Sequence, residues 1–222
     1  MAMLTKLYYW LHRRVSKKDE RGEYSSGYWQ DKIRREALKM CRNSSGRSLE
    51  VGCGEGLFLT QLARQNPQTQ VWGIDFNEER LRRVNEKIKE QGIANIHVLL
   101  LAAPQLTFED EYFDTVVCVN VFLNMESLDT VRQALQEIHR VCKRSGKVIF
   151  DFRNSRNLFM NLKYRLARYY DRTLKNLPLN TYHPQHIESL LRELGFSIRN
   201  RVCLGFFMKR YAPLIIIEAV KV

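Results

Sequence analysis

The residues best suited to chemistry lie between positions 50 and 75, where closely spaced glycines stand between two carboxylates. The stretch Leu49–Gly56 reads Leu-Glu-Val-Gly-Cys-Gly-Glu-Gly, and Asp75 follows Gly52 by 23 residues. Glycines let a backbone turn tightly and let a ligand approach without meeting a Cβ. A carboxylate at the end of the next strand can accept both hydroxyl hydrogens of a ribose. The combination predicts a nucleoside site more strongly than a glycine loop alone would.

The spacing of the glycines separates two classes of nucleoside cofactor. A dinucleotide fingerprint is Gly-x-Gly-x-x-Gly, and it would need glycine at position 57, where this chain has Leu57. The third glycine is instead Gly56, and an acid, Glu50, lies inside the preceding strand. The pattern therefore disfavours an NAD-binding module.

At this point the chain resembles class I S-adenosylmethionine (SAM)-dependent methyltransferases, whose first motif is an acid followed by x-Gly-x-Gly-x-Gly. The resemblance covers roughly residues 28–152 and returns at 182–222, and it favours the small-molecule branch that includes quinone-biosynthesis methyltransferases. The other matching segments are Tyr28-Trp29, Val71–Asp75, Leu106–Asp114, Leu135–Lys147 and His183–Phe196.

The resemblance implies that SAM is the cofactor and that S-adenosylhomocysteine (SAH) is the product. The residues implied to bind it are Glu50, Gly52, Cys53, Gly54, Gly56, Asp75, Phe76, Ala102, Ala103 and Asn120. The glycines should line the methionine part, and Glu50 should orient their loop or reach the amino group through water. Asp75 should hold the ribose with Phe76 beside the adenine, and Asn120 should lie near the reacting methyl. Ala102 replaces an aspartate that often contacts the adenine in this family, so backbone groups there should hold the base.

Methyl transfer from a sulfonium is an in-line displacement, in which the protein mainly aligns the nucleophile and excludes water. A base is needed only if the acceptor must lose a proton. We predict Asp151 and His183 as catalytic candidates, with Tyr182 and His186 as further options. Asp151 ends a strand at the carboxyl edge of the sheet, where ligands bind in such folds. Many relatives have a histidine pair after the fourth strand, but this chain has Leu123-Asn124, which excludes a histidine base there.

Strand and helix patterns alternate along most of the chain. Strands are expected at Arg47–Gly52, Gln70–Asp75, Ile96–Leu101, Asp114–Asn120, Lys147–Phe152, Phe196–Gly205 and Leu214–Val222. Helices are expected at Trp29–Cys41 and Gly56–Arg64, after the caps Asn77 and Ser127, and from Pro184 to Gly195. These elements predict a single doubly wound, Rossmann-like α/β domain. Its seven-stranded sheet should be mostly parallel with an antiparallel C-terminal strand, and Ile96–Leu101 should be buried on both faces.

The positive charge is concentrated in two segments outside this alternating pattern. The chain has a net charge of +12, and residues 1–40 and 151–180 each contribute a net +5. We expect residues 1–27 to be a basic amphipathic extension, residues 28–222 the methyltransferase domain, and residues 153–180 a basic helical cap inserted in it. Leu158, Leu162, Leu166 and Tyr169 or Tyr170 fit one helical stripe in the cap. This stripe either packs on the core or lets the basic cap sit on anionic headgroups.

Such charge suits an anionic partner, namely a membrane surface, a nucleic acid or an acidic substrate. We favour a small or lipid-like acceptor with peripheral contact to an anionic membrane. No apolar run approaches the roughly 20 residues that span a bilayer, and the N-terminus does not read as a signal peptide. We therefore expect a cytoplasmic protein, with the inner membrane surface as its peripheral site.

Two other functions remain open at the level of sequence. An RNA methyltransferase would use the interleaved tyrosines and basic residues for stacking and phosphate contacts, although no separate nucleic-acid domain is visible. A non-catalytic SAM-binding regulatory protein would fit the substitution at Ala102 and the missing histidine pair. The five scattered cysteines predict reduced core thiols, and no metal site is expected because their spacing fits none. The sequence leaves the oligomeric state open.

Overall fold

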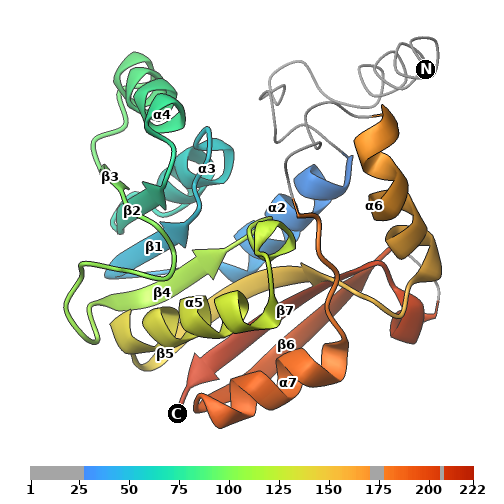
Figure 1. The fold of residues 1–222 in the computed structure, drawn as a ribbon. Coiled ribbons are helices and arrows are strands. Elements are labelled where there is room, and N and C mark those ends of the chain that lie inside the picture. The colour runs from blue at the N-terminus through green and yellow to red at the C-terminus, as the bar shows by residue number, and fades with distance from the viewer. Residues whose placement is uncertain (1–27, 171–177, 206–207) are drawn as a thin grey trace.

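The structure, a computed structural model, describes residues 28–170, 178–205 and 208–222. Its strands are β1 (Arg47–Val51), β2 (Gln70–Asp75), β3 (Ile96–Leu100), β4 (Phe113–Cys118), β5 (Cys142–Arg153), β6 (Phe196–Leu204) and β7 (Leu214–Lys221). Its α-helices are α2 (Tyr28–Met40), α3 (Leu57–Gln65), α4 (Glu78–Glu90), α5 (Leu128–Val141), α6 (Leu158–Tyr170) and α7 (Pro184–Glu193). Two short 3-10 helices are η2 (Phe122–Asn124) and η4 (Lys209–Tyr211). Strands and helices alternate along the chain, as predicted (Figure 1).

The strands pair in one sheet in the order β3-β2-β1-β4-β5-β7-β6. β7 runs antiparallel to both β5 and β6, and the other pairs are parallel. The predicted seven-stranded, mostly parallel sheet with an antiparallel C-terminal strand is therefore confirmed. The direction of winding reverses between β1 and β4. Connections leave these two strands toward opposite faces, which opens a crevice at their carboxyl ends.

Each face of the sheet has its own hydrophobic core. Val116 and Cys118 of β4 pack in the core that α5 and α7 cover, whereas Val117 and Val119 pack in the core that α2, α3 and α4 cover. Neighbouring residues alternate in this way because successive side chains of a strand point to opposite faces. The two layers of helices hold the sheet between them (Figure 1).

Local signals in the sequence set several helix ends. The Asn77 side chain accepts a hydrogen bond from the N–H of Arg80 (3.0 Å), and Ser127 does the same for Thr130 (3.2 Å). Both predicted N-caps are confirmed. Gly195, with φ of 80°, follows the end of α7, where only glycine takes this conformation without strain.

One prediction about burial was wrong. β3 is the edge strand of the sheet, and Leu99 and Leu100 are exposed rather than buried on both faces. The position of a strand in a sheet depends on which strands it pairs with. An apolar strand sequence does not specify those partners. In α2, Ile33 and Ala37 are fully buried, and Met40 at the end of the helix is half-buried against the same core.

β5 begins earlier than predicted, directly after α5. Its regular parallel register with β4 starts at Lys147, which faces Thr115, and continues to Phe150 beside Cys118. Residues 143–146 form an irregularity opposite the step from Phe113 to Thr115. The regular part coincides with the predicted strand Lys147–Phe152, so the extra residues extend an element that was correctly identified.

Helix α6 forms the described part of the predicted cap and stands at one end of the sheet (Figure 1). Its Met160 is buried, but Leu158 and Phe159 are 80% and 76% exposed, and Leu162 and Leu166 are exposed as well. The alternative in which this stripe packs on the core is therefore wrong for these leucines. Residues 171–177 of the cap and the predicted extension 1–27 lie outside the described residues. Within the part of the chain that the structure describes, no helix is long and apolar enough to cross a bilayer.

Replacing the cap Asn77 with alanine tests how α4 begins. We expect Asn77→Ala to lower the free energy of unfolding by about 1 kcal/mol, because one N–H at the helix start loses its partner. Asn85→Ala is the matched control, since Asn85 is exposed within the same helix and alanine favours a helix interior. Urea denaturation of both variants measures the difference, and equal losses would contradict the cap.

Candidate functional site

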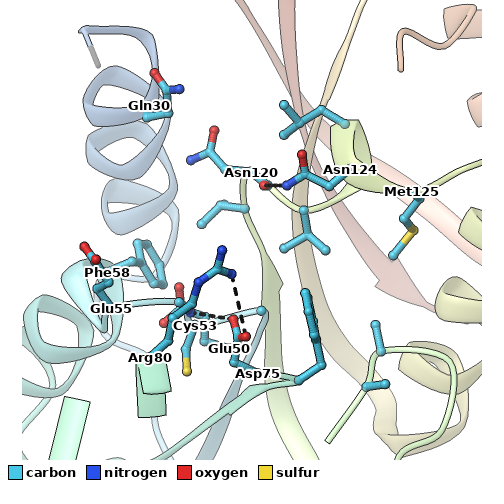
Figure 2. A pocket seen from close by; sticks show the side chains of 18 of the residues that line it. Gln30, Glu50, Cys53, Glu55, Phe58, Asp75, Arg80, Asn120, Asn124 and Met125 are labelled. Carbon is cyan, nitrogen blue, oxygen red and sulfur yellow. Dashed lines mark hydrogen bonds and ion pairs between the residues drawn. The ribbon is translucent and has the colours of Figure 1, made fainter. Parts of the chain in front are cut away.

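A cavity of about 560 Å³ opens at the carboxyl ends of β1, β2, β3 and β4, at the predicted crevice (Figure 2). The predicted cofactor residues that line it are Glu50, Gly52, Cys53, Gly54, Asp75, Phe76, Ala102, Ala103 and Asn120. These residues lie at the ends of four different strands and in the loops that follow them. Pairing of the strands in the sheet brings these residues together although they are far apart in the sequence. Gly56, Asp151 and His183 do not belong to the lining.

The glycine loop is tied to β2 by its own backbone. The N–H groups of Gly52 and Cys53 both donate to the Ile74 carbonyl at 2.8 Å, and the N–H of Gly54 donates to Oδ2 of Asp75 at 2.9 Å. A Cβ on Gly54 would meet nothing within 4 Å, which leaves this backbone open to a ligand. A glycine loop that keeps such an approach clear is what a nucleoside cofactor requires.

Gly56 has a different role from the one predicted. It precedes α3 with φ of 72°, and a Cβ there would lie 3.1 Å from the Val84 side chain of α4. Gly56 thus allows the turn and the close packing of two helices, and it does not face the cavity. The motif alone could not separate these functions, because both require glycine.

Asp75 is buried and already accepts hydrogen bonds at both oxygens. Oδ2 accepts from Gly54, and Oδ1 accepts from the N–H of Asn77 at 2.9 Å. The guanidinium of Arg80 lies 3.7 Å from Oδ1 and points into the cavity (Figure 2). A carboxylate has about four lone-pair positions, so Asp75 keeps capacity to accept from a ribose.

Glu50 is a buried carboxyl group at the inner end of the cavity. Burial raises the pKa of Glu50 well above its usual range, and the guanidinium of Arg34 counteracts this in part. Among the described residues, no group donates a hydrogen bond to its Oε2. A buried acceptor without a partner is costly, and an ammonium group of a ligand would satisfy it.

Arg34 also lines this end of the cavity, although it comes from α2. It is a buried arginine, and its positive charge acts on the Glu50 carboxyl group. An α-amino acid carries an ammonium and a carboxylate on one carbon, and Glu50 and Arg34 supply the opposite charges. This end of the cavity therefore fits the amino-acid part of SAM.

Aromatic and small side chains form another part of the cavity wall. Phe76 is exposed beside Arg80, whose guanidinium carbon lies 5.9 Å from the ring centre. Ala102 and Ala103 line the wall after β3. A flat adenine fits between small and aromatic side chains of this kind, so the chain offers groups suited to each part of SAM.

Asn120 follows β4 at the edge of the cavity and adopts φ of 60°, which is uncommon for a residue other than glycine. Asp151 lies behind it with both oxygens occupied, one by the Asn120 N–H and one by Arg153. Burial raises the pKa of Asp151, while the Arg153 charge and the Asn120 hydrogen bond lower it. The structure places Asp151 beneath the cavity wall, so its predicted role as a base gains no support.

His183 lies at the start of α7, outside the cavity lining. Its Nε2 accepts a hydrogen bond from Nε of Arg156 at 3.1 Å, and the His186 ring centre is 5.1 Å away. Burial lowers the pKa of His183, and the positive charges of Arg156 and His186 lower it further. The geometry does not bring this histidine together with the cofactor residues.

The sequence prediction missed three arginines that line the cavity, namely Arg34, Arg80 and Arg153. Arg80 had a local signal, because it lies one helical turn into α4 after Asp75. Arg34 and Arg153 had none, since they come from α2 and β5 and only the folded sheet brings them to the cavity.

Comparison with known proteins supports the same kind of site. A family described as a methyltransferase domain matches residues 49–146. Phosphatidylethanolamine N-methyltransferase from Cereibacter sphaeroides is 35% identical over 57% of this chain and 60% of its own length. Demethylmenaquinone methyltransferase from Geobacillus kaustophilus is 32% identical over 54% of this chain and 50% of its own length. The chain thus spans about half of the length of these relatives.

Solved structures share the fold. Magnesium protoporphyrin IX methyltransferase from Synechocystis, solved with bound SAH, has a TM-score of 0.67 and 19% identity over 98% of this chain and 95% of its own. A SAM-dependent methyltransferase from Methanosarcina mazei has a TM-score of 0.68 and 19% identity over 84% and 97% of the two chains.

Two glycine substitutions separate contact with the cofactor from packing. Gly54→Ala and Gly56→Ala each force a side chain into a left-handed conformation, at a cost of roughly 1–2 kcal/mol in stability. Only Gly54→Ala adds a methyl group to the cavity, so we expect it to weaken SAM binding by about tenfold or more, whereas Gly56→Ala should change the affinity less than about threefold. Calorimetric titration and thermal denaturation measure the two effects, and equal affinities would contradict this placement.

Proposed function

We propose that the chain is a class I SAM-dependent methyltransferase that transfers a methyl group from SAM to a small or lipid-like acceptor. The match of residues 49–146 to a methyltransferase domain supports this proposal. The observation that carries the proposal is the cavity at the reversal of the sheet, which combines an open glycine loop with buried, oppositely charged side chains. Neither the cavity nor the two curated relatives favours the RNA-methylating or the regulatory alternative. Residues 28–222 form the enzyme in this proposal, with the segment around α6 as its cap.

Different residues around the cavity bind different parts of SAM in this proposal. Asp75 accepts hydrogen bonds from the ribose hydroxyls of SAM, and Glu50 accepts them from its ammonium group. Arg34 faces the carboxylate of SAM. Phe76, with the backbone near Ala102, flanks the adenine. When bound, the cofactor supplies a methyl group already activated on a sulfonium, so the chain needs only to align the acceptor and exclude water.

The acceptor side of the cavity lies beyond Asn120. Val121, Leu123 and Met125 line it with apolar side chains, and Glu126 is the carboxylate in the same stretch. An acceptor whose nucleophile has a free lone pair needs no base for an in-line displacement. The names of the two relatives, which act on phosphatidylethanolamine and demethylmenaquinone, support a lipid-like acceptor.

Helix α6 supports a peripheral contact with an anionic membrane. Its exposed side chains Leu158, Phe159, Leu162 and Leu166 present apolar surface next to Lys163 and Arg165. An amphipathic helix of this kind lies in the headgroup region, with apolar side chains inserted and basic ones near lipid phosphates. This contact would bring a lipid acceptor to the cap without removing it far from the bilayer.

The proposed activity is tested with purified protein, SAM and vesicles containing phosphatidylethanolamine, or a short-chain demethylmenaquinone in detergent that dithionite has reduced to the quinol. We expect release of S-adenosylhomocysteine with at least one of these acceptors. Asp75→Asn should weaken SAM binding about tenfold or more, since a charged hydrogen-bond acceptor becomes a neutral one. Release with neither acceptor, from folded protein that binds SAM, would remove the lipid-like acceptor class.

Membrane contact is tested by vesicle co-sedimentation. We expect binding to vesicles with anionic lipid at low salt, and a loss of about tenfold in the triple variant Leu158→Ser, Phe159→Ser, Leu162→Ser. The double variant Ile198→Ser, Val222→Ser is the control, because both residues are exposed but lie on β6 and at the C-terminus. Equal binding by both variants would show that α6 is not the contact surface.

A further inference from the structure

Two fully buried charged side chains beside the cavity have no part in the cofactor contacts described above. Asp151 is 1% exposed and Arg153 is 2% exposed, and both lie at the end of β5. Removing charges from water costs several kcal/mol per ion unless hydrogen bonds and an opposite charge replace the water. An apolar pair could fill the same space without this cost. The contacts that the two ions make therefore point to their role.

Those contacts converge on Asn120. One oxygen of Asp151 accepts the Asn120 backbone N–H at 2.5 Å, and the other forms an ion pair with Nη1 of Arg153. Nη2 of Arg153 donates to the side-chain oxygen of Asn120 at 2.9 Å. The pair therefore fixes both the backbone and the carboxamide of a residue held in a left-handed conformation.

The third contact of Arg153 leads to the cap. Its Nε donates to the phenol oxygen of Tyr164 at 2.9 Å, and Tyr164 belongs to α6. Arg153 and Asn120 both line the cavity, so the chain of contacts runs from the cap helix to the cavity wall without a gap. A guanidinium suits this position because its planar fork bonds several acceptors in fixed directions.

We propose that Asp151 and Arg153 are positioning residues that hold Asn120 against the acceptor side of the cavity, and that Tyr164 couples helix α6 to them. The inference rests on the proposed methyl transfer, but the contacts exist without cofactor or acceptor. It assigns Asp151 to orientation rather than to proton abstraction. Helix α6 then has two roles in the proposal. It contacts the lipid surface, and through Tyr164 it helps to position Asn120 in the cavity wall.

Amide hydrogen exchange on the unliganded protein, followed by NMR, tests the contacts without any reaction. We expect Arg153→Lys to speed exchange of the Asn120 N–H by about tenfold or more, since lysine cannot reproduce the fork. Tyr164→Phe should speed it by about threefold or more, and Tyr211→Phe, outside these contacts, should leave it unchanged. The N–H of Gly54 should exchange at its normal rate in all three. Unchanged exchange at Asn120 in both Arg153→Lys and Tyr164→Phe would overturn the proposal.

A double-mutant cycle on the reaction tests whether Arg153 acts through Asn120. Asn120→Gly deletes the carboxamide and keeps the backbone conformation, because glycine accepts positive φ. With phosphatidylethanolamine vesicles as acceptor, Arg153→Lys should lower kcat about tenfold, but less than about threefold in the Asn120→Gly background. The KM for SAM should stay within about threefold throughout. Equal losses of kcat in both backgrounds would overturn the coupling.

Asp151→Asn separates positioning from general-base catalysis. Positioning predicts a lower kcat with an unchanged pH profile of kcat/KM, because no proton passes through the carboxylate. Loss of an acidic limb in that profile would identify a base and overturn the proposal. If no acceptor is methylated at all, the proposed function fails, while the exchange measurement still decides the positioning role.

Discussion

The hydrogen bond from the Gly54 N–H to the Asp75 carboxylate joins the two features on which the site depends. It ties the loop after β1 to the end of β2, and the same carboxylate fixes the start of α4 through Asn77. The glycine loop therefore keeps its open shape without a ligand. Because a preformed cavity loses little conformational entropy on binding, this bond prepares the chain for a cofactor.

The reversal of the sheet between β1 and β4 determines what else reaches the cavity. It brings Glu50 and Gly52 to one side and Asn120 to the other, with α2 and the end of β5 adding Arg34 and Arg153. Charges that would be costly when buried alone compensate each other in pairs. The cavity thus has charged groups at Glu50 and Arg34 and apolar side chains at Val121, Leu123 and Met125.

Much of the fold follows from local patterns in the sequence. The caps Asn77 and Ser127 and the start of α7 at Pro184 depend on neighbours in the chain, so they could be predicted. The exposed edge position of β3 could not, because strand order depends on pairing between distant segments. The exposed stripe of α6 shows the same limit, since helical periodicity identifies an apolar face but not what covers it.

Some residues of the candidate site could likewise be predicted from the sequence and others could not. Glu50, Gly54 and Asp75 stand in one recognisable motif and its following strand, and the structure gathers them around one cavity. Gly56 fits the motif but serves helix packing, and Arg34 and Arg153 belong to no local pattern. Residues that act through tertiary contacts, such as Asp151 on Asn120, become visible only when the strands are assembled.

A crystal structure of the protein with bound SAH would test the central claim most directly. We expect the ribose hydroxyls within hydrogen-bonding distance of Asp75, the ammonium group at Glu50 and the carboxylate facing Arg34. SAH bound elsewhere, or a cavity that stays empty at saturating SAH, would contradict it.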